Sequence, residues 1–142
     1  MPDSWSAKCA EPIFESLAVI GCGLIGSSIL RVARRNNLAR RLSAADASPA
    51  VCERVKELNL ADRTTCDLAD AVRDVDLVIL CVPVGANKEV GQTIGPALKA
   101  GAVVSDVGSV KGAVINALAP SLPESVQLIP AHPVAGTEHS GP

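Results

Sequence analysis

Aromatic residues are almost absent from this chain of 142 residues. It has no tyrosine, and its single tryptophan and single phenylalanine, Trp5 and Phe14, lie within the first fourteen positions. Apolar residues nevertheless make up 48% of the sequence, so the core must be built from aliphatic side chains. Short runs of valine, isoleucine, leucine and alanine are typical of parallel strands buried on both faces. The length fits one domain.

An excess of positive charge and long apolar runs are also lacking. The formal net charge is −2, whereas binding to a nucleic-acid backbone requires clustered lysine and arginine, so we expect no nucleic-acid partner. No apolar stretch reaches the roughly 18 residues that span a bilayer, which argues against a membrane partner. Residues 1–15 are polar and lack the apolar segment of a secretory signal, which predicts a flexible leader followed by one domain over 16–142.

The cysteines form no recognisable ligand pattern. Their spacing matches neither a zinc site nor a CxxC motif, so no metal site is predicted. An odd number of cysteines favours reduced thiols in a cytoplasmic protein. Two of them stand in apolar strand-end contexts and are predicted to be small buried hydrophobic residues rather than nucleophiles. The five are Cys9, Cys22, Cys52, Cys66 and Cys81, and the two at strand ends are Cys22 and Cys81.

Predicted strands and helices alternate along the chain. Apolar runs predict strands at 16–21, 42–46, 76–82, 102–106 and 126–131, with a weaker strand near Thr64. Helical spacing of apolar residues predicts a helix after each strand except the last. Pro49 and Asp67 mark two helix starts, and Gly101 is predicted to cap the end of another helix. In the first helix, residues 24–36, the side chains predicted to face the sheet are Ile25, Ile29, Val32 and Ala33.

A glycine motif joins the first predicted strand to the first helix. Gly21, Gly23 and Gly26 form G-x-G-x-x-G, with Leu24 and Ile25 in the variable positions before the last glycine. Gly21 permits a tight turn, Gly23 lets a diphosphate approach the main chain, and Gly26 lets the helix pack closely on the strand. Unpaired amides at the helix start would face the phosphates, assisted by the helix dipole. The motif therefore predicts a dinucleotide-binding turn.

An acidic residue at the end of the second strand supports this interpretation. Asp46 follows Gly26 by twenty residues, where a carboxylate accepts hydrogen bonds from the adenosine ribose and repels a 2′-phosphate. NAD is therefore favoured over NADP. The alternatives are a plain glycine turn with an acidic helix cap before Pro49, or a flavin site. The alternation and the motif together predict an α/β fold: a doubly wound, mostly parallel Rossmann-type sheet with helices on both faces.

Three further strand ends carry candidate site residues, because ligands of open α/β sheets bind beyond the carboxyl ends of the strands. Val82 and Pro83 would border the cofactor, or simply stop the strand. Ser109 is placed to cap a helix and to bind a substrate hydroxyl, and Lys111 is either a surface charge or an anion contact. His132 would accept a proton from a substrate hydroxyl, or be held by backbone groups at the strand end.

Four segments, VIGCGLIGSS, CVPV, SDVGSVKG and HPVAGTEHSGP, resemble the ordered landmarks of the prephenate dehydrogenase family, which includes arogenate and cyclohexadienyl dehydrogenases. The resemblance implies NAD-dependent oxidative decarboxylation of prephenate to 4-hydroxyphenylpyruvate, or of arogenate to tyrosine, in tyrosine biosynthesis. It implies that His132 hydrogen-bonds the C4 hydroxyl and assists its deprotonation, and that Ser109 orients both groups. Thr137 and Glu138 would lie at the edge of the substrate site.

The family also carries a second, helical domain that forms a homodimer and supplies cations for the substrate carboxylates. The sequence contains no such segment, and past Ser105 its only lysine or arginine is Lys111. We therefore expect a cofactor-binding part that turns over substrate poorly by itself. The remaining alternatives are another NAD(P)-dependent dehydrogenase, of the hydroxyacid or pyrroline-carboxylate reductase kind, and a non-catalytic NAD-binding domain.

Overall fold

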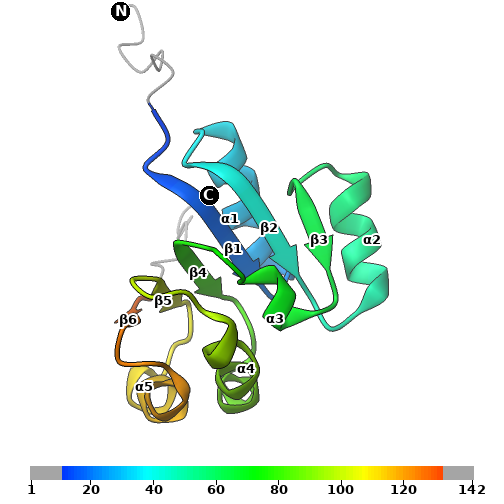
Figure 1. The fold of residues 1–142 in the computed structure, drawn as a ribbon. Coiled ribbons are helices and arrows are strands. Elements are labelled where there is room, and N and C mark those ends of the chain that lie inside the picture. The colour runs from blue at the N-terminus through cyan, green and yellow to red at the C-terminus, as the bar shows by residue number, and fades with distance from the viewer. Residues whose placement is uncertain (1–10, 133–142) are drawn as a thin grey trace, which may run out of the picture.

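A computed structural model describes residues 11–132 of the chain. Six strands form one sheet in the order β3-β2-β1-β4-β5-β6, and every neighbouring pair is parallel (Figure 1). The strand order reverses direction between β1 and β4, which confirms the doubly wound fold. The strands are β1 Phe14–Ile20, β2 Ala39–Ala45, β3 Arg63–Thr65, β4 Leu77–Leu80, β5 Val103–Asp106 and β6 Gln127–Pro130.

Helices cover both faces of the sheet, and each face has its own apolar core. Consecutive residues of β1 alternate between the two cores: Val19 packs with Leu30 of α1, whereas Ile20 packs with residues of α4 and α5, including Ile94 and Leu118. This alternation follows from the pleat of the strand. The helices are α1 Leu24–Arg35, α2 Pro49–Glu57, α3 Leu68–Ala71, α4 Asn87–Ile94 and α5 Lys111–Leu118, with 3₁₀ turns at Val84–Ala86, Gly95–Ala97 and Ala119–Ser121.

Two sequence-based expectations near the start of the sheet need correction. The first strand begins at Phe14, two residues before the predicted start, so Phe14 and Glu15 belong to the sheet rather than to a leader. The buried face of α1 was predicted only in part: Ala33 is buried and Ile29 is half-buried against the core, as expected, but Ile25 and Val32 are not. Its buried residues are Gly26, Leu30 and Ala33, while the side chains of Ile25 and Val32 are 45% and 51% exposed. The close approach of Gly26 to β1 fixes the rotation of α1 about its axis. The face that carries Ile25 and Val32, one position along the chain from the buried face, therefore turns towards solvent.

The helix ends are partly as predicted. Pro49 begins α2, and the Ser48 hydroxyl before it accepts a hydrogen bond from the Val51 amide. Asp67 caps α3 by accepting from the Asp70 amide, as expected. Gly101 was expected to end a helix, but α4 ends at Ile94 and continues only as a 3₁₀ turn. Gly101 instead has a φ of +82° in the turn that leads into β5, a conformation that favours glycine.

The parallel order places the carboxyl ends of all six strands at one edge of the sheet. The segments after β1, β2, β4, β5 and β6 carry the residues that the sequence singled out, so the fold brings them to a common edge. Among the helices within residues 11–132, none is long and apolar enough to cross a membrane.

Candidate functional site

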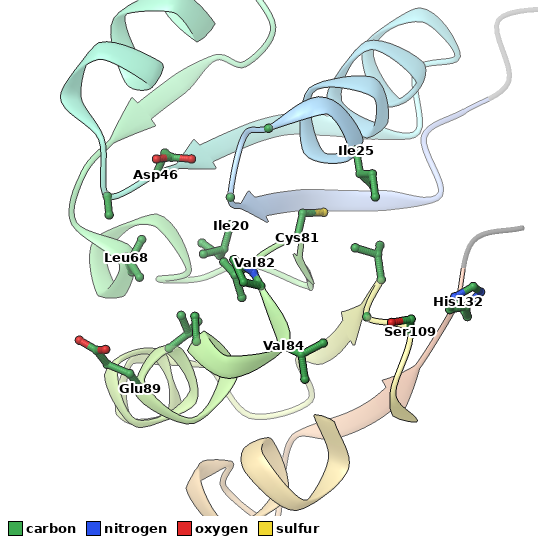
Figure 2. Close-up of a pocket in the computed structure, with 18 residues that line it drawn as sticks. Ile20, Ile25, Asp46, Leu68, Cys81, Val82, Val84, Glu89, Ser109 and His132 are labelled. Carbon is green, nitrogen blue, oxygen red and sulfur yellow. The ribbon is translucent and has the colours of Figure 1, made fainter. Parts of the chain in front are cut away.

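A cavity of about 870 Å³ lies at this edge (Figure 2). Its volume is within the range of small-molecule and cofactor sites. In Figure 2, Asp46, Leu68 and Glu89 lie at one end, and Ser109 and His132 lie at the other. The walls combine the strand ends with the first turns of the following helices: Ile20, Gly21, Gly23, Ile25, Asp46, Ala47, Leu68, Cys81, Val82, Pro83, Val84, Ala86, Glu89, Val90, Val107, Gly108, Ser109 and His132.

The three glycines of the motif meet different surroundings. Gly21 has a φ of +89°, and a Cβ added there would lie 2.5 Å from the Cys81 carbonyl oxygen. A Cβ on Gly26 would lie 1.9 Å from the Gly21 carbonyl oxygen, so the helix and the turn touch through their main chains. Around Gly23, by contrast, nothing lies within 4 Å of such a Cβ. Gly21 and Gly26 are therefore required by the fold, and Gly23 leaves open space where a ligand can approach the backbone.

The start of α1 is arranged to receive an anion. Gly23 occupies the capping position without a side-chain hydrogen bond, and no acidic residue stands in the first turn. The Ser27 amide is the first to bond back, to the Gly23 carbonyl oxygen at 2.9 Å. The amides before it have no partner within the helix, and the positive end of the helix dipole adds to their attraction for negative charge. This geometry suits a diphosphate.

Asp46 is fixed by two backbone amides. Its Oδ2 accepts from the Cys22 amide at 2.9 Å, and its Oδ1 accepts from the Ser48 amide at 2.9 Å. Each carboxylate oxygen has a second lone pair, so both can still accept from hydroxyl groups of a ligand. Among the described walls of the cavity the charged side chains are Asp46 and Glu89, and neither lysine nor arginine occurs. These walls favour ribose hydroxyls over a phosphate at that end.

The middle of the cavity is apolar. Val82 is half-buried and Pro83 exposed at the end of β4, and both line the wall, as expected. Burial raises the pKa of the Cys81 thiol to about 12, with Asp106 adding to the effect. Burial, with Asp46 as the next cause, likewise raises the pKa of Cys22 to about 12. Both thiols therefore stay protonated at neutral pH. Cys22 is buried, as predicted, whereas Cys81 is only half-buried in the cavity wall.

Sequence reasoning did not find several of the apolar walls. Leu68 of α3 and Ala86 of the 3₁₀ turn after β4 belong to no motif, whereas Val84 and Val107 lie within the segments CVPV and SDVGSVKG but were not singled out as site residues. Their position close to strand ends is the signal that could have pointed to all four. Conversely, Leu24 and Gly26 of the motif are not among the cavity walls: the Leu24 side chain is 90% exposed, and Gly26 is buried against β1.

Ser109 and His132 come from adjacent strand ends and line the same end of the cavity. Ser109 does not cap the helix as predicted. The helix α5 begins at Lys111, its capping position is Val110, and no side-chain hydrogen bond closes its start. The serine lies one position too early for that role, and it is exposed to the cavity instead. Thr137 and Glu138 lie outside the described residues.

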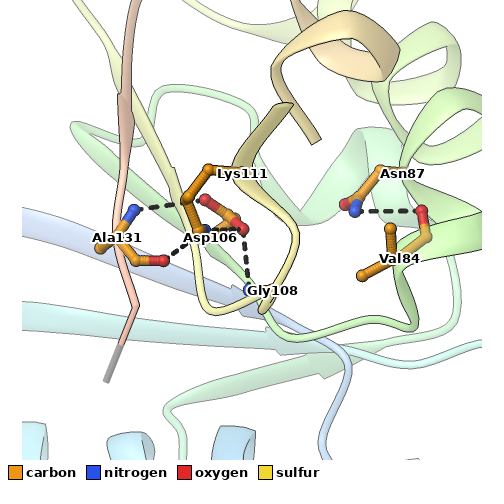
Figure 3. A network of polar contacts seen from close by, with 6 residues as sticks. All are labelled: Val84, Asn87, Asp106, Gly108, Lys111 and Ala131. Atoms are coloured by element: carbon orange, nitrogen blue, oxygen red, sulfur yellow. Dashed lines mark hydrogen bonds and ion pairs between the residues drawn. The ribbon is translucent and has the colours of Figure 1, made fainter. Parts of the chain in front are cut away.

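A buried carboxylate links the two strand ends (Figure 3). Asp106, only 1% exposed, accepts hydrogen bonds from the Gly108 amide at 2.8 Å, from Lys111 Nζ at 2.6 Å and from the Ala131 amide at 3.3 Å. Lys111 Nζ also donates to the Ala131 carbonyl oxygen. Lys111 is therefore engaged within the protein, and its charge is balanced by Asp106. The network ties the loop that carries Ser109 to the residue before His132.

We expect Asp106 and Lys111 to stabilise the fold jointly. In urea denaturation, Asp106→Ala and Lys111→Met should each lower the free energy of unfolding, because each removes the charged partner of the other: among the described residues, Lys111 then keeps only the Ala131 carbonyl oxygen, and Asp106 keeps only the Gly108 and Ala131 amides. The double variant should lose less than the sum of the two by about 1.5–3 kcal/mol, the usual contribution of a charged hydrogen bond. Strictly additive losses would show that the pair contributes nothing beyond its separate side chains.

The fold and site define the class of the protein. A doubly wound parallel sheet, a glycine turn before an uncapped helix and an acidic residue ending the second strand together describe a Rossmann-type nucleotide-binding domain. The family model described as prephenate dehydrogenase, nucleotide-binding domain, matches residues 29–142. The chain therefore belongs to the prephenate dehydrogenase family, as its nucleotide-binding domain.

Named relatives agree. The chain is 45% identical over 130 residues to a cyclohexadienyl dehydrogenase from Zymomonas mobilis, covering 92% of this chain and 44% of that protein. Among solved structures, it is 28% identical to a prephenate dehydrogenase from A. aeolicus in complex with hydroxyphenyl propionate and NAD⁺, with a TM-score of 0.77 over 87% of this chain and 43% of that one. An arogenate dehydrogenase from Synechocystis is 29% identical, with a TM-score of 0.76, and the match covers 87% of this chain and 42% of that one. The chain thus spans less than half the length of these relatives.

Proposed function

We propose that the chain binds NAD at the carboxyl edge of its sheet and forms the cofactor half of an enzyme that oxidatively decarboxylates prephenate or arogenate. The observation that carries this proposal is one cavity that runs from the glycine turn and Asp46 to Ser109 and His132. The A. aeolicus relative, whose structure contains NAD⁺, and the Zymomonas mobilis cyclohexadienyl dehydrogenase support the choice of cofactor and reaction.

The residues present fit the cofactor. The open amides at the start of α1 would hold the diphosphate, with Gly23 leaving room for it. Asp46 would accept from the adenosine ribose, and its two amide contacts keep the carboxylate oriented for that task. The apolar walls around Val82 and Val84 would exclude water from the middle of the cavity. When bound, NAD supplies the hydride acceptor.

His132 and Ser109 would act on the substrate hydroxyl. A neutral imidazole of His132 accepts the proton of the C4 hydroxyl, which builds carbonyl character at C4 and favours departure of hydride. Ser109, exposed on the adjacent strand end, orients that hydroxyl. Loss of the ring carboxylate as CO₂ then makes the ring aromatic. The proton therefore passes to a residue of this chain.

The substrate carboxylates would need cations from outside the described residues. No lysine or arginine among residues 11–132 lines the cavity, and Lys111 is held by Asp106. We propose that a segment corresponding to the rest of the relatives supplies these cations and forms a homodimer, and that the protein acts on its small-molecule substrate in the cytoplasm. Calorimetric titration of the 142-residue chain with NAD, and then assays of the full-length enzyme with prephenate and arogenate, test the proposal. Absence of NAD binding would refute it.

We expect Asp46→Ala to weaken NAD binding by about tenfold or more, because a charged hydrogen bond contributes about 1.5–3 kcal/mol. Binding of NADP should weaken less or improve, since the carboxylate that repels the 2′-phosphate is gone. Parallel calorimetric titrations of both cofactors measure the change in their ratio. Glu89→Gln is the matched control, since it removes a carboxylate from the same wall without touching the glycine turn. An equal loss for NAD and NADP in Asp46→Ala would indicate loosening of the turn instead of lost recognition.

A further inference from the structure

Two cysteines meet behind Asp46 and are not among the described walls of the cavity. Cys52 lies in α2, Cys66 lies in the turn between β3 and α3, and their Sγ atoms are 3.3 Å apart. Cys52 is 3% exposed, whereas Cys66 is exposed to solvent. The two cysteines are fourteen positions apart, and the sequence does not reveal their pairing, because it depends on how α2 packs beside β3. A thiol pair with one exposed member is accessible to exchange with disulfides in solution.

The other described cysteines, Cys22 and Cys81, form no such thiol pair and are less exposed than Cys66. Cys22 is buried and Cys81 half-buried, and burial raises the pKa of each to about 12. The pKa of the Cys52 thiol is also raised, first by burial and then by the hydrogen bond with Cys66. Because Cys66 is the exposed member of the pair, it is the thiol that reacts first with an oxidant, and Cys52 is close enough to react in the second step.

We propose that Cys52 and Cys66 form a reversible disulfide with a low-molecular-weight disulfide such as oxidised glutathione, and that this bond weakens dinucleotide binding. The Cys66 thiolate attacks one glutathione sulfur, forming a mixed disulfide and releasing one glutathione thiol. The Cys52 sulfur then attacks the Cys66 sulfur and displaces the second glutathione. Two protein thiols are oxidised, two glutathione thiols are formed, and the two protein protons end on them or in solvent.

The link to binding is Asp46. The Cys52 Sγ lies 3.3 Å from the Asp46 carbonyl oxygen and 3.5 Å from that of Thr65, and the Asp46 amide donates to Thr65 at 3.4 Å. A disulfide is about 2.05 Å long, so bonding draws the two sulfurs together by more than about 1 Å and removes the S–H donor. Any part of this approach that side-chain rotation does not supply shifts α2 and the turn before α3, and both helices contact β2. The second half of this inference rests on the proposed function, because it takes Asp46 as the ribose contact.

The experiment uses the 142-residue chain with Cys9→Ser, which removes a thiol outside the described residues. The protein is incubated with oxidised glutathione and then analysed by intact mass and by peptide mapping. We expect loss of two hydrogen atoms without a retained glutathione, and a cross-linked peptide pair containing Cys52 and Cys66. Calorimetry should show NAD binding weakened about three- to tenfold in the oxidised form, the size of one weakened hydrogen bond, and restored by dithiothreitol.

Cys66→Ser is the matched control, because it keeps a small polar group but cannot form the bond. Its NAD affinity should equal that of the reduced chain and should not respond to oxidised glutathione. A stable glutathione adduct on Cys66, or no reaction at all, would overturn the disulfide. A complete disulfide with unchanged NAD affinity would overturn its effect on binding. If the reduced chain bound no NAD while the disulfide still formed, the proposed function would fail and the thiol pair would stand.

Discussion

Replacing Gly26 with alanine is expected to lower the free energy of unfolding by about 3 kcal/mol or more, the upper range for overpacking a rigid site. The added Cβ would lie 1.9 Å from the Gly21 carbonyl oxygen and 3.2 Å from the Val19 side chain. The first contact is with main chain, so no rotation of a side chain relieves it. The helix must move away from β1, and the core around Leu30 opens with it. Urea denaturation followed by circular dichroism measures the loss.

Gly23→Ala is the matched control for this prediction. Its Cβ meets nothing within 4 Å, so the cost to stability should stay below about 1 kcal/mol, as for a weaker helix cap. The methyl group would instead occupy the approach to the open amides of α1. We expect NAD binding to fall about tenfold or more, which corresponds to about 1.4 kcal/mol. Equal stability losses in the two variants would contradict the distinction drawn between these glycines.

Replacing His132 with asparagine is expected to reduce kcat of the full-length enzyme by about 10²- to 10⁴-fold, the usual contribution of a general base. Asparagine keeps a polar side chain of smaller size but cannot take the proton from the substrate hydroxyl. NAD affinity should change little, because His132 lies at the opposite end of the cavity from Asp46. Steady-state assays of NADH formation and separate NAD titrations distinguish the two effects.

Ser109→Ala provides the comparison for His132. It removes a hydroxyl from the adjacent strand end without removing a proton acceptor, so its loss of kcat should be smaller. The ratio of the two losses separates orientation of the substrate from proton transfer. Unchanged turnover in His132→Asn would assign the proton acceptor to another residue, while leaving the proposed NAD site intact.

Much of the site followed from sequence because parallel strands all end at one edge. Once strands and helices were seen to alternate, Asp46, Ser109 and His132 had to lie near the same edge as the glycine turn. The turn itself was predictable because Gly21 and Gly26 perform backbone tasks that only glycine performs at those positions. These inferences needed local patterns and one rule of topology, and no detail of side-chain packing.

The other features of the fold and site depended on side-chain packing, which the spacing of apolar residues does not determine. In α1, apolar residues occupy two neighbouring faces, and spacing alone did not select Leu30 over Val32 as buried. The sequence around Lys111 does not predict its ion pair with Asp106, because the conformation of the loop between them decides whether the two side chains meet. Cys52 and Cys66 lie fourteen residues apart and meet only because α2 lies beside β3.

The network around Asp106 joins the two strand ends that carry Ser109 and His132. A single carboxylate bonds the Gly108 amide, next to Ser109, and the Ala131 amide, next to His132, while Lys111 spans both. Displacement of one strand end is therefore transmitted to the other through hydrogen bonds to one carboxylate. On the proposed function, a ring-shaped substrate would be admitted without parting the strand ends that carry Ser109 and His132.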